Sequence, residues 1–447
     1  QSMRIRSVAV AVVVALAAAA CSNSSGVKTT TRTTAPRTTA TSAGPFVHVD
    51  QPGVSDTEIH VGSVTSTTNP LGGNYGELNA GIKAYFEMVN GGGGLYGRKL
   101  RLTSERDDAV ANNQAQVQAM LSQDNVFSVF VATLLFTGAD LLQRQAVPTF
   151  GWNINSEFAD KDHLFGNIGA ICFGCTGRML PYVASKIGAK RVGVLAYGIS
   201  QQSKEGAAGT RESFKQFPTA QVAYYDDSLP FGVPDLSAQV AAMKRAGVDF
   251  VAADMDFNGV FTLAKEMQKQ GLKAVQWLPN AYDHDFMAAN GQFFEGDYVE
   301  TQFVAWEHTP RIKQVSDFLD WTARTGGKQS ELSMTGWIVA DMFVTGLRKA
   351  GPDFSRQKLV DALNSGIYDP GGLIEPIDWR YRHGDPTKPG HDSPIECFTA
   401  VQVTGGKFVP AFTDKGPWNC FDGRQQQLGA PITLDEARQI LAQGPLK

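Results

Sequence analysis

The residues best suited to chemistry in this sequence are its cysteines. Five are present, and four remain, Cys172, Cys175, Cys397 and Cys420, once Cys21 is assigned to the leader described below. An even set in an oxidising compartment favours two disulfides. Proximity in the sequence favours pairing Cys172 with Cys175 and Cys397 with Cys420, among the three pairings that four cysteines allow. The C-x-x-C spacing of the first pair leaves a thiol oxidoreductase open, and a zinc site is a weaker alternative because the second pair is widely spaced.

Other catalytic signatures are missing from the sequence. The glycine-rich stretch 91–97 follows a helix-like segment and precedes a strand-like one, which is the reverse of the order in a dinucleotide-binding loop. No P-loop, H-E-x-x-H or G-x-S-x-G motif occurs. His284 lies between Asp283 and Asp285, and we interpret this cluster as a solvated loop. The sequence therefore predicts a protein that is not an enzyme and has no cofactor or metal.

The amino terminus has the layout of a secretory leader. Arg4 and Arg6 precede an uncharged apolar run, residues 8–20, which is too short to span a bilayer. Three alanines and Cys21 close the run, and this arrangement resembles the lipobox at which bacterial lipoproteins are cleaved and diacylated. We therefore expect residues 3–21 to be a lipoprotein signal peptide. The lipid on Cys21 would anchor the protein to the outer face of the bacterial cytoplasmic membrane, and an ordinary signal peptide is the alternative.

Composition separates a tether from a body in the rest of the chain. Residues 22–55 begin with a stretch made almost entirely of Ser, Thr, Ala, Gly and Pro, which cannot build a core and predicts a flexible tether. The roughly 400 residues that follow suggest two domains. A net charge of -4 gives no basic surface for nucleic acid.

The body alternates strand-like and helix-like segments in two series. The first series has strands near 59–64, 100–102, 126–132 and 147–150, with helices over 78–89 and 110–121. The second series has strands at 191–196, 222–225, 250–253 and 275–278, with helices over 176–187, 203–217, 235–246 and 259–270. Two more helices follow, over 311–324 and 331–349. Such alternation predicts parallel sheets covered by helices on both faces, and two series predict two lobes whose strand-end loops face a cleft.

The segment from Ile59 to Leu102 resembles the opening of the leucine, isoleucine and valine binding proteins. It reads IHVGSVTSTTNPLGGNYGELNAGIKAYFEMVNGGGGLYGRKLRL, in which a strand, a glycine-containing loop, a helix, an Asn-Gly-Gly turn and a second strand follow in the family's order. The resemblance continues through VFSVFVATLLFTGAD, GAKRVGVLAYG, VDFVAADMDFNGVFTLAKEMQKQGLK and MTGWIVADMFVTGLRKAG. It therefore covers about residues 56–351.

This resemblance implies the type I periplasmic binding fold, an α/β fold with two Rossmann-like lobes, parallel sheets and three crossing segments as a hinge. We expect the crossings near 165–171, 299–305 and 373–379. Lobe 1 would comprise 56–168 and 305–372, lobe 2 would comprise 169–304 and 373–425, and 426–447 would be a C-terminal tail. The implied role is that of a monomeric, extracytoplasmic solute-binding protein of an ABC importer, which delivers a small molecule to a membrane permease. A ligand-sensing receptor subunit is the alternative.

The family's ligand contacts transfer to this sequence only in part. The corresponding positions and their loop neighbours are Tyr75, Phe136, Thr137, Trp152, Asn153, Asn155, Gln202, Ser203, Asp256, Phe257, Asn280 and Tyr282. Phe136 stands where amino-acid binders hold the ligand carboxylate with a serine, and Asn280 replaces an acid that pairs with the ligand ammonium. A desolvated ammonium needs an opposite charge, so an amino acid requires Asp256 or Asp254 as a substitute. The aromatic residues favour an amino acid or a small apolar or aromatic carboxylate.

Overall fold

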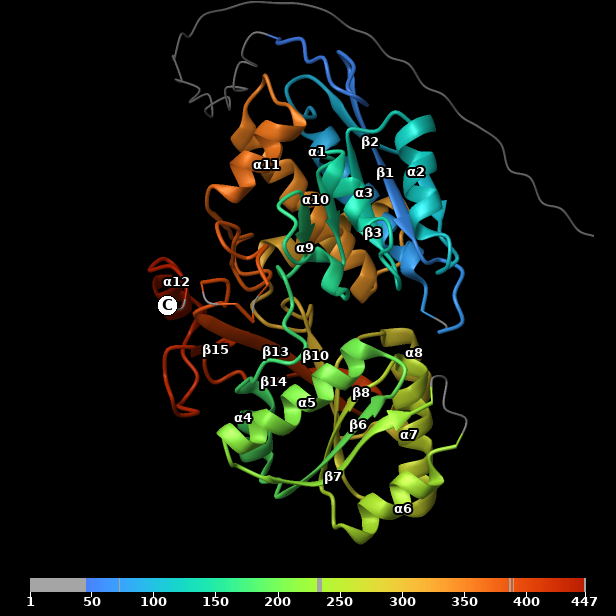
Figure 1. Ribbon diagram of the computed structural model, residues 1–447, viewed down its shortest axis with the longest axis vertical. Helices are drawn as coiled ribbons and strands as arrows, with labels where there is room; N and C mark the ends of the chain where they lie inside the picture. Colours follow the sequence, from blue (N-terminus) through green and yellow to red (C-terminus); the bar gives the residue numbers. More distant parts are fainter. Residues whose placement is uncertain (1–45, 72, 231–234, 386, 389, 446–447) are drawn as a thin grey trace, which may run out of the picture. The chain divides into compact units, whose positions relative to one another are not determined.

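The computed structural model describes residues 46–71, 73–230, 235–385, 387–388 and 390–445 (Figure 1). The predicted signal peptide, Cys21 and most of the predicted tether lie outside these residues. The packed body begins ahead of the predicted boundary at residue 55, because Val49 is buried and the backbone N–H of His60 donates to the carbonyl of Gly53. No helix in the described part of the chain is both long and apolar enough to cross a membrane.

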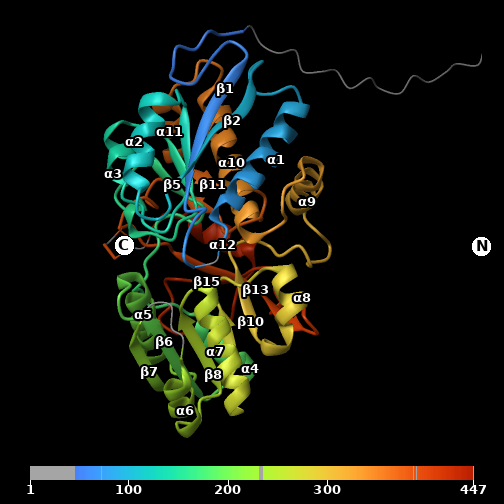
Figure 2. The same cartoon turned by 90° about the vertical axis from the view of Figure 1, so that its right-hand side faces the viewer.

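Lobe 1 is built on a five-stranded parallel sheet in the order β2-β1-β3-β4-β5. Its strands are β1 (Glu58–Thr65), β2 (Lys99–Asp107), β3 (Ser128–Ala132), β4 (Thr149–Gly151) and β5 (Leu164–Gly166). Its helices are α1 (Leu78–Gly91), α2 (Asn113–Gln123), α3 (Ala139–Arg144), α9 (Lys313–Thr325), α10 (Glu331–Ala350) and α11 (Arg356–Asn364), with short turns η1 (Tyr75–Glu77) and η2 (Ser156–Phe158). Figure 2 shows α2 and α3 on one face of this sheet and α1 and α10 on the other.

The two faces explain the burial of the central strand. All five residues of β3 are buried, as expected for a parallel strand that is covered on both sides. Val129 and Val131 pack in one apolar cluster with Val117 of α2, whereas Phe130 packs in another cluster with Phe86 of α1. The predicted alternation of parallel strands and covering helices is therefore confirmed for this lobe.

Helices α1 and α10 cross in lobe 1 with their backbones in contact. A Cβ built on Gly81 would lie 1.7 Å from the carbonyl oxygen of Ser333, and a Cβ built on Gly336 would lie 2.0 Å from the carbonyl oxygen of Leu78. Real Cβ atoms do not approach other atoms so closely, so only glycine fits at either position. The crossing also fixes the place of Tyr75, because η1 runs directly into α1.

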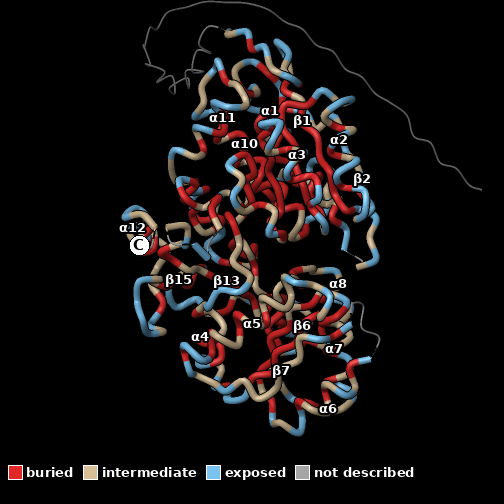
Figure 3. The backbone as a smooth tube through the Cα atoms, in the orientation of Figure 1, coloured by how far each residue is buried: buried red, intermediate tan, exposed pale blue. Residues whose placement is uncertain are grey.

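Lobe 2 carries an eight-stranded mixed sheet in the order β14-β13-β10-β9-β8-β6-β7, with β15 paired to β13. Its strands are β6 (Arg191–Tyr197), β7 (Gln221–Leu229), β8 (Phe250–Asp254), β9 (Val275–Leu278), β10 (Tyr298–Thr301), β13 (Ile395–Thr404), β14 (Lys407–Ala411) and β15 (Asn419–Asp422). Strands β6 to β10 pair in parallel, and β13 to β15 add antiparallel pairs. Its helices are α4 (Met179–Ile187), α5 (Gln201–Gln216), α6 (Ser237–Arg245), α7 (Phe257–Gln270) and α8 (His284–Asn290), with the short turn η3 (Gly291–Phe293). Figure 3 shows buried residues along the strands of both lobes.

The chain passes between the two sheets three times. The first passage lies between β5 and α4, and the second lies between β10 and α9. The third follows the small ladder of β11 (Ile367–Tyr368) and β12 (Ile377–Asp378) and leads to β13, so it runs later than the predicted 373–379. The expected tail at 426–447 contains α12 (Leu434–Leu441), whose Ala437 and Leu441 are buried beside Trp418.

Both predicted disulfides are present. Cys172 pairs with Cys175 in the loop before α4, and Cys397 of β13 pairs with Cys420 directly opposite on β15. With both pairs oxidised, none of these four cysteines is free to bind zinc, so the zinc alternative is wrong for this state of the protein.

Candidate ligand-binding cleft

A cavity of about 760 Å³ lies between loops of the two lobes, which belong to one compact unit of the chain. Lobe 1 contributes residues after β1, β2, β3 and β4, and lobe 2 contributes residues after β6, β8 and β9, together with Phe173 from the first passage. Parallel strands bring these loops to one edge of each sheet. The volume is in the range of about 300–1,000 Å³ that is usual for small-molecule sites.

The two sides of the cavity are close enough to interact directly. The Asn258 side-chain amide, near the start of α7, donates to the Leu71 carbonyl in the loop after β1 at 2.5 Å. Burial raises the pKa of Tyr75, and the charge of Asp256 from the opposite lobe adds to the shift. The cavity is therefore a site to which both lobes contribute contacts.

Much of the cavity wall is apolar. Tyr75 and Trp152 lie with their ring centroids 5.5 Å apart, and both are largely buried. Two large apolar side chains are exposed at the cavity instead: Leu135 in lobe 1 is 53% exposed, and Ile199 in lobe 2 is 80% exposed. Exposed apolar groups around a concave site are typical of surfaces that become covered on binding.

Several polar groups of the wall already have partners within the protein. Asp256 is the N-cap of α7, where its carboxylate accepts from the backbone N–H of Asn258 and Gly259 and from the Tyr197 hydroxyl. The Ser203 hydroxyl accepts from the Tyr197 backbone N–H at 2.9 Å and donates to the backbone carbonyl of Asp254. These side chains hold the strand ends of lobe 2 in place.

Other polar atoms of the wall have no partner in the described part of the chain. Among them are the indole N–H of Trp152 and the side-chain oxygen Oδ1 of Asn280, both of them buried atoms. Asn155 is different, since its amide donates to the Thr133 carbonyl at 2.9 Å. Buried polar atoms in native proteins are nearly always paired, so a donor and an acceptor left open beside a cavity indicate a ligand.

Seven of the twelve predicted positions line the cavity, namely Tyr75, Trp152, Asn155, Gln202, Ser203, Asp256 and Asn280. Three predicted aromatic residues lie elsewhere. Phe136 is buried in the core of lobe 1, Phe257 packs on Phe286 with ring centroids 4.3 Å apart, and the buried Tyr282 donates its hydroxyl to Glu307. A position shortly after a strand suggested that these three side chains would face the cleft. Such a position also allows a side chain to pack into the core, and these three pack against other residues instead.

Thr137 and Asn153 are also outside the cavity wall. The exposed Thr137 hydroxyl accepts from the Gln114 backbone N–H in the first turn of α2. Asn153 is fully buried, and its amide donates to the Gly169 carbonyl in the first passage between the lobes. Both side chains therefore support loops around the cleft.

The residues that sequence reasoning missed are mostly apolar. They include Pro70, Leu71, Val110, Leu134, Leu135, Ile154, Ile199, Met255 and Pro279, besides the polar Ser200 and Gln201 and the residue Tyr197. Their one signal in the sequence is position, because most of them come shortly after a strand ends. Apolar residues at such positions, without helical spacing, are candidates for the walls of a cleft.

His284 does not lie in a solvated loop as the sequence analysis proposed. Its Nε2 lies 2.5 Å from Oε1 of Glu307 and 3.0 Å from the indole Nε1 of Trp306, and the His284 and Trp306 rings are stacked. Asp283 caps α8. The cluster lies at the start of α8, packs against the second passage between the lobes through Trp306 and Glu307, and does not line the cavity.

Two α/β lobes, joined by three passages and enclosing a small-molecule cavity at their strand ends, define a solute-binding protein. The chain belongs to the periplasmic binding protein family, whose model matches residues 58–407. The family resemblance seen in the sequence is thus confirmed, and proteins of this family are exported. No curated protein matches the sequence significantly.

Solved structures of substrate-binding proteins share the fold. A branched-chain amino acid ABC transporter protein from Thermus thermophilus with bound valine is 17% identical, with 86% of this chain and 98% of that chain covered and a TM-score of 0.65. A fatty acid ABC transporter substrate-binding protein from Thermomonospora curvata is 19% identical, with 84% and 95% covered and a TM-score of 0.66. A solute-binding protein from R. palustris in complex with 4-hydroxybenzoate is 16% identical, with 83% and 98% covered and a TM-score of 0.65. These likenesses confirm the type I periplasmic binding fold.

Proposed function

We propose that the protein is the extracytoplasmic solute-binding subunit of an ABC importer, capturing an amino acid or a small apolar or aromatic carboxylate for delivery to a membrane permease. The observation that carries this proposal is the cavity of about 760 Å³ with walls from both lobes. Three passages between the lobes suit a hinge that closes the lobes around a ligand. The solutes named for the structural relatives, valine, a fatty acid and 4-hydroxybenzoate, support the size class.

The proposed location follows from the leader. The predicted lipidation of Cys21 would hold a monomeric body at the outer face of the membrane by two acyl chains, which suffice for stable anchoring. A Ser/Thr-rich tether would let the body reach its permease.

Nothing in the first disulfide favours the thiol oxidoreductase alternative. A redox C-x-x-C of the thioredoxin type lies at a strand-to-helix turn. Here β5 ends at Gly166 and α4 begins at Met179, so Cys172 and Cys175 lie within a long loop. The disulfide closes a short turn within that loop, and the turn contains Phe173, a residue of the cavity wall, which supports a structural role in the binding site.

The proposal is tested by a thermal-shift screen against amino acids, amines, fatty acids and aromatic acids, followed by calorimetry of the hits. A ligand that binds only the native state raises its stability by about 2.7 kcal/mol at a hundredfold excess over Kd. A saturable increase with one-site calorimetry would support capture, and uptake of the same solute with the adjacent permease would support import. If no solute in the panel stabilised the protein, capture of these solute classes would be contradicted. Binding without uptake would favour the sensing alternative.

Ile199→Ser is expected to weaken binding of the identified solute about tenfold while leaving the melting temperature of the empty protein unchanged. Ile199 is 80% exposed at the cavity, so it contributes little to the empty fold and gains contacts only when a ligand or the opposite lobe covers it. Covering part of such a side chain contributes about 1.4 kcal/mol, which is a factor of ten in Kd.

Val409→Ser is the matched control for this change. Val409 is 47% exposed on β14 and does not line the cavity. Calorimetry and thermal melts of the two variants should separate them. If Ile199→Ser bound the solute as tightly as Val409→Ser, Ile199 would not be part of the closed site.

A further inference from the structure

Asp254 is the cavity carboxylate whose side chain has no hydrogen-bond partner among the described residues. Asp254 and Asp256 are the two acids of the cavity wall, and Asp256 is occupied by the helix cap and the Tyr197 hydroxyl. Within the described residues, no hydrogen bond or ion pair reaches the Asp254 side chain, whose backbone carbonyl alone is bonded. Burial raises the pKa of Asp254 to about 7, and Glu300 adds to the shift. The buried surroundings of the Asp254 carboxylate therefore disfavour its ionised form.

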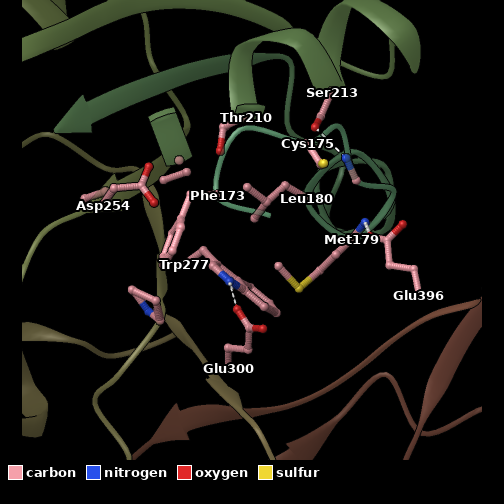
Figure 4. A pocket seen from close by; sticks show the side chains of 15 residues that line it. Phe173, Cys175, Met179, Leu180, Thr210, Ser213, Asp254, Trp277, Glu300 and Glu396 are labelled. Atoms are coloured by element: carbon pink, nitrogen blue, oxygen red, sulfur yellow. Dashed lines mark hydrogen bonds between the residues drawn. The ribbon is translucent and has the colours of Figure 1, made fainter. Parts of the chain in front are cut away.

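Asp254 lines two neighbouring cavities. A side chamber of about 230 Å³ in lobe 2 shares Phe173, Asp254 and Pro279 with the main cavity (Figure 4). The carboxylate can therefore be reached from the cleft, and Figure 4 shows it beside the Phe173 ring.

The other acids of the side chamber have structural partners. Glu300 accepts from the Trp277 indole N–H at 3.1 Å, and Glu396 accepts from the backbone N–H groups of Arg178 and Met179 where α4 begins (Figure 4). Their roles in the fold are accounted for without a ligand. Asp254 differs from both, because no residue in the described chain donates a hydrogen bond to its side chain or forms an ion pair with it.

Helix α5 passes close to Asp254 without giving its side chain a hydrogen bond in the described chain. Gly206 of α5 lies so close that a Cβ built on it would be 2.6 Å from Oδ1 of Asp254. A larger residue at this position would displace the carboxylate, so glycine is what allows Asp254 to keep its place in the cavity wall.

A free acceptor adjoins Asp254 on the neighbouring strand end. Ala252 of β8 pairs with Trp277 of β9 in a parallel register, so two residues further on Asp254 comes beside Pro279, and Asn280 follows. The Asn280 Oδ1 is a buried acceptor without a partner in the described chain. Asp254 and Asn280 both line the cavity, and a carboxylate and an amide oxygen in one wall can accept hydrogen bonds from a group with several N–H donors.

The charge of the cavity favours a cation and disfavours an anion. Its described lining contains two acids and no lysine, arginine or histidine. A ligand carboxylate would therefore find no countercharge there, and an unpaired charge in a partly desolvated site is costly. The aromatic faces of Tyr75, Trp152 and Phe173 suit both an apolar body and a neighbouring cation.

We propose that the ligand is an apolar molecule that carries a primary ammonium group, held by Asp254 and Asn280, and that a carboxylate on the ligand is not required. This inference rests on the proposed function of solute capture, since it describes the same cavity, and it replaces the carboxylate in the proposed ligand class with an ammonium group. It makes Asp254 the residue that selects for the cation. The sequence comparison had left the role open between Asp256 and Asp254, and the hydrogen bonds of Asp256 assign it to Asp254.

The test is calorimetry at pH 8 with two matched series of ligands. The first series is 3-methylbutylamine, L-leucine and 4-methylpentanoate, and the second is 2-phenylethylamine, L-phenylalanine and 3-phenylpropanoate. The wild-type protein should bind at least one amine, bind the corresponding amino acid no more tightly, and show no binding of the acid. Asp254→Asn should weaken the amine at least tenfold, because it removes the charge and keeps the shape.

Asp414→Asn is the control for the loss of one charge. Asp414 is in the same lobe but is exposed and pairs with Lys186, and neither residue is in the described cavity lining, so the amine affinity should not change. A melting temperature of Asp254→Asn at or above that of the wild type would show that this variant is folded. Removing an unpaired, partly buried carboxylate should not destabilise the protein.

The binding results distinguish failure of this inference from failure of the proposed function. Acids that bind the wild type as tightly as the amines, or amines that bind Asp254→Asn with wild-type affinity, would overturn the ammonium assignment while solute capture stood. If no amine bound but another solute did, the ligand class would be wrong and the proposed function intact. If nothing in either screen bound, both proposals would fail together.

Discussion

Gly336→Ala should lower the melting temperature by about 6–12 °C. In an isolated helix the same change would be favourable by about 1 kcal/mol, because alanine is the better helix former. Here the new methyl group would start 2.0 Å from the Leu78 carbonyl oxygen, so α1 and α10 must separate along their crossing. Overpacking of this kind costs about 3 kcal/mol, and each kcal/mol lowers Tm by roughly 2–4 °C in a domain of this size.

Gly366→Ala is the matched control. Nothing lies within 4 Å of a Cβ built on Gly366, and its backbone is not among those with positive φ. Thermal melts should therefore show a loss for Gly336→Ala and almost none for Gly366→Ala. Similar melting temperatures for the two variants would mean that the helix crossing can widen at little cost, contrary to the close contact described above.

Binding of 3-methylbutylamine or 2-phenylethylamine should become at least about tenfold tighter between pH 5.5 and pH 8. Asp254 has a pKa of about 7 in the empty protein, so much of it is protonated at pH 5.5 and most of it is ionised at pH 8. The ammonium binds the ionised form. Alkylamines resemble the lysine side chain, with a pKa of about 10.4, so the ligand keeps its charge over this range.

The direction follows from proton linkage. Below about pH 7 an amine must displace a proton from Asp254, and a single group changes the affinity by at most about tenfold per pH unit. The groups that act on Asp254 are Glu300 of β10, whose pKa burial raises to about 7, and Tyr225 of β7, whose pKa is raised and which stays neutral in this range. Calorimetry in buffers of different ionisation heats would detect the released proton. An affinity independent of pH would contradict the role of Asp254, and Asp254→Asn should show a much smaller dependence.

Periodicity predicted the parallel parts of both lobes because those segments are regular and long enough to show a pattern. The strand expected at 275–278 coincides with β9, and the helix expected at 331–349 lies within α10. Periodicity gave no bounds for the antiparallel strands β13 to β15. Their pairing joins Cys397 to Cys420 and β13 to β10, about a hundred residues earlier. Contacts of that range leave no local pattern in the sequence.

The sequence predicted which loops would form the candidate site, but it did not predict which side chains of those loops would face the cavity. Loops after strands did converge on a cavity, but sequence alone does not show whether Phe136 turns into the core or Ile199 turns outward. Asp254 and Asp256, the two acids at the end of β8, cannot be told apart by residue type. The start of α7 uses Asp256 as its cap, and only that choice leaves Asp254 free for another role. Tertiary structure therefore decides which residue of a pair is available.

The three passages between the lobes also govern when the protein can fold during its synthesis. Lobe 1 needs α10 beside α1, and the ribosome makes 239 residues between the end of α1 at Gly91 and the start of α10 at Glu331. At about 5–20 residues per second, α1 waits on the order of tens of seconds for its partner. During that time the apolar face of α1 lacks the contacts with α10 that bury it in the folded protein. A chain of this topology can stay extended long enough to pass through a translocation channel, because its first lobe completes only after most of the chain has been made.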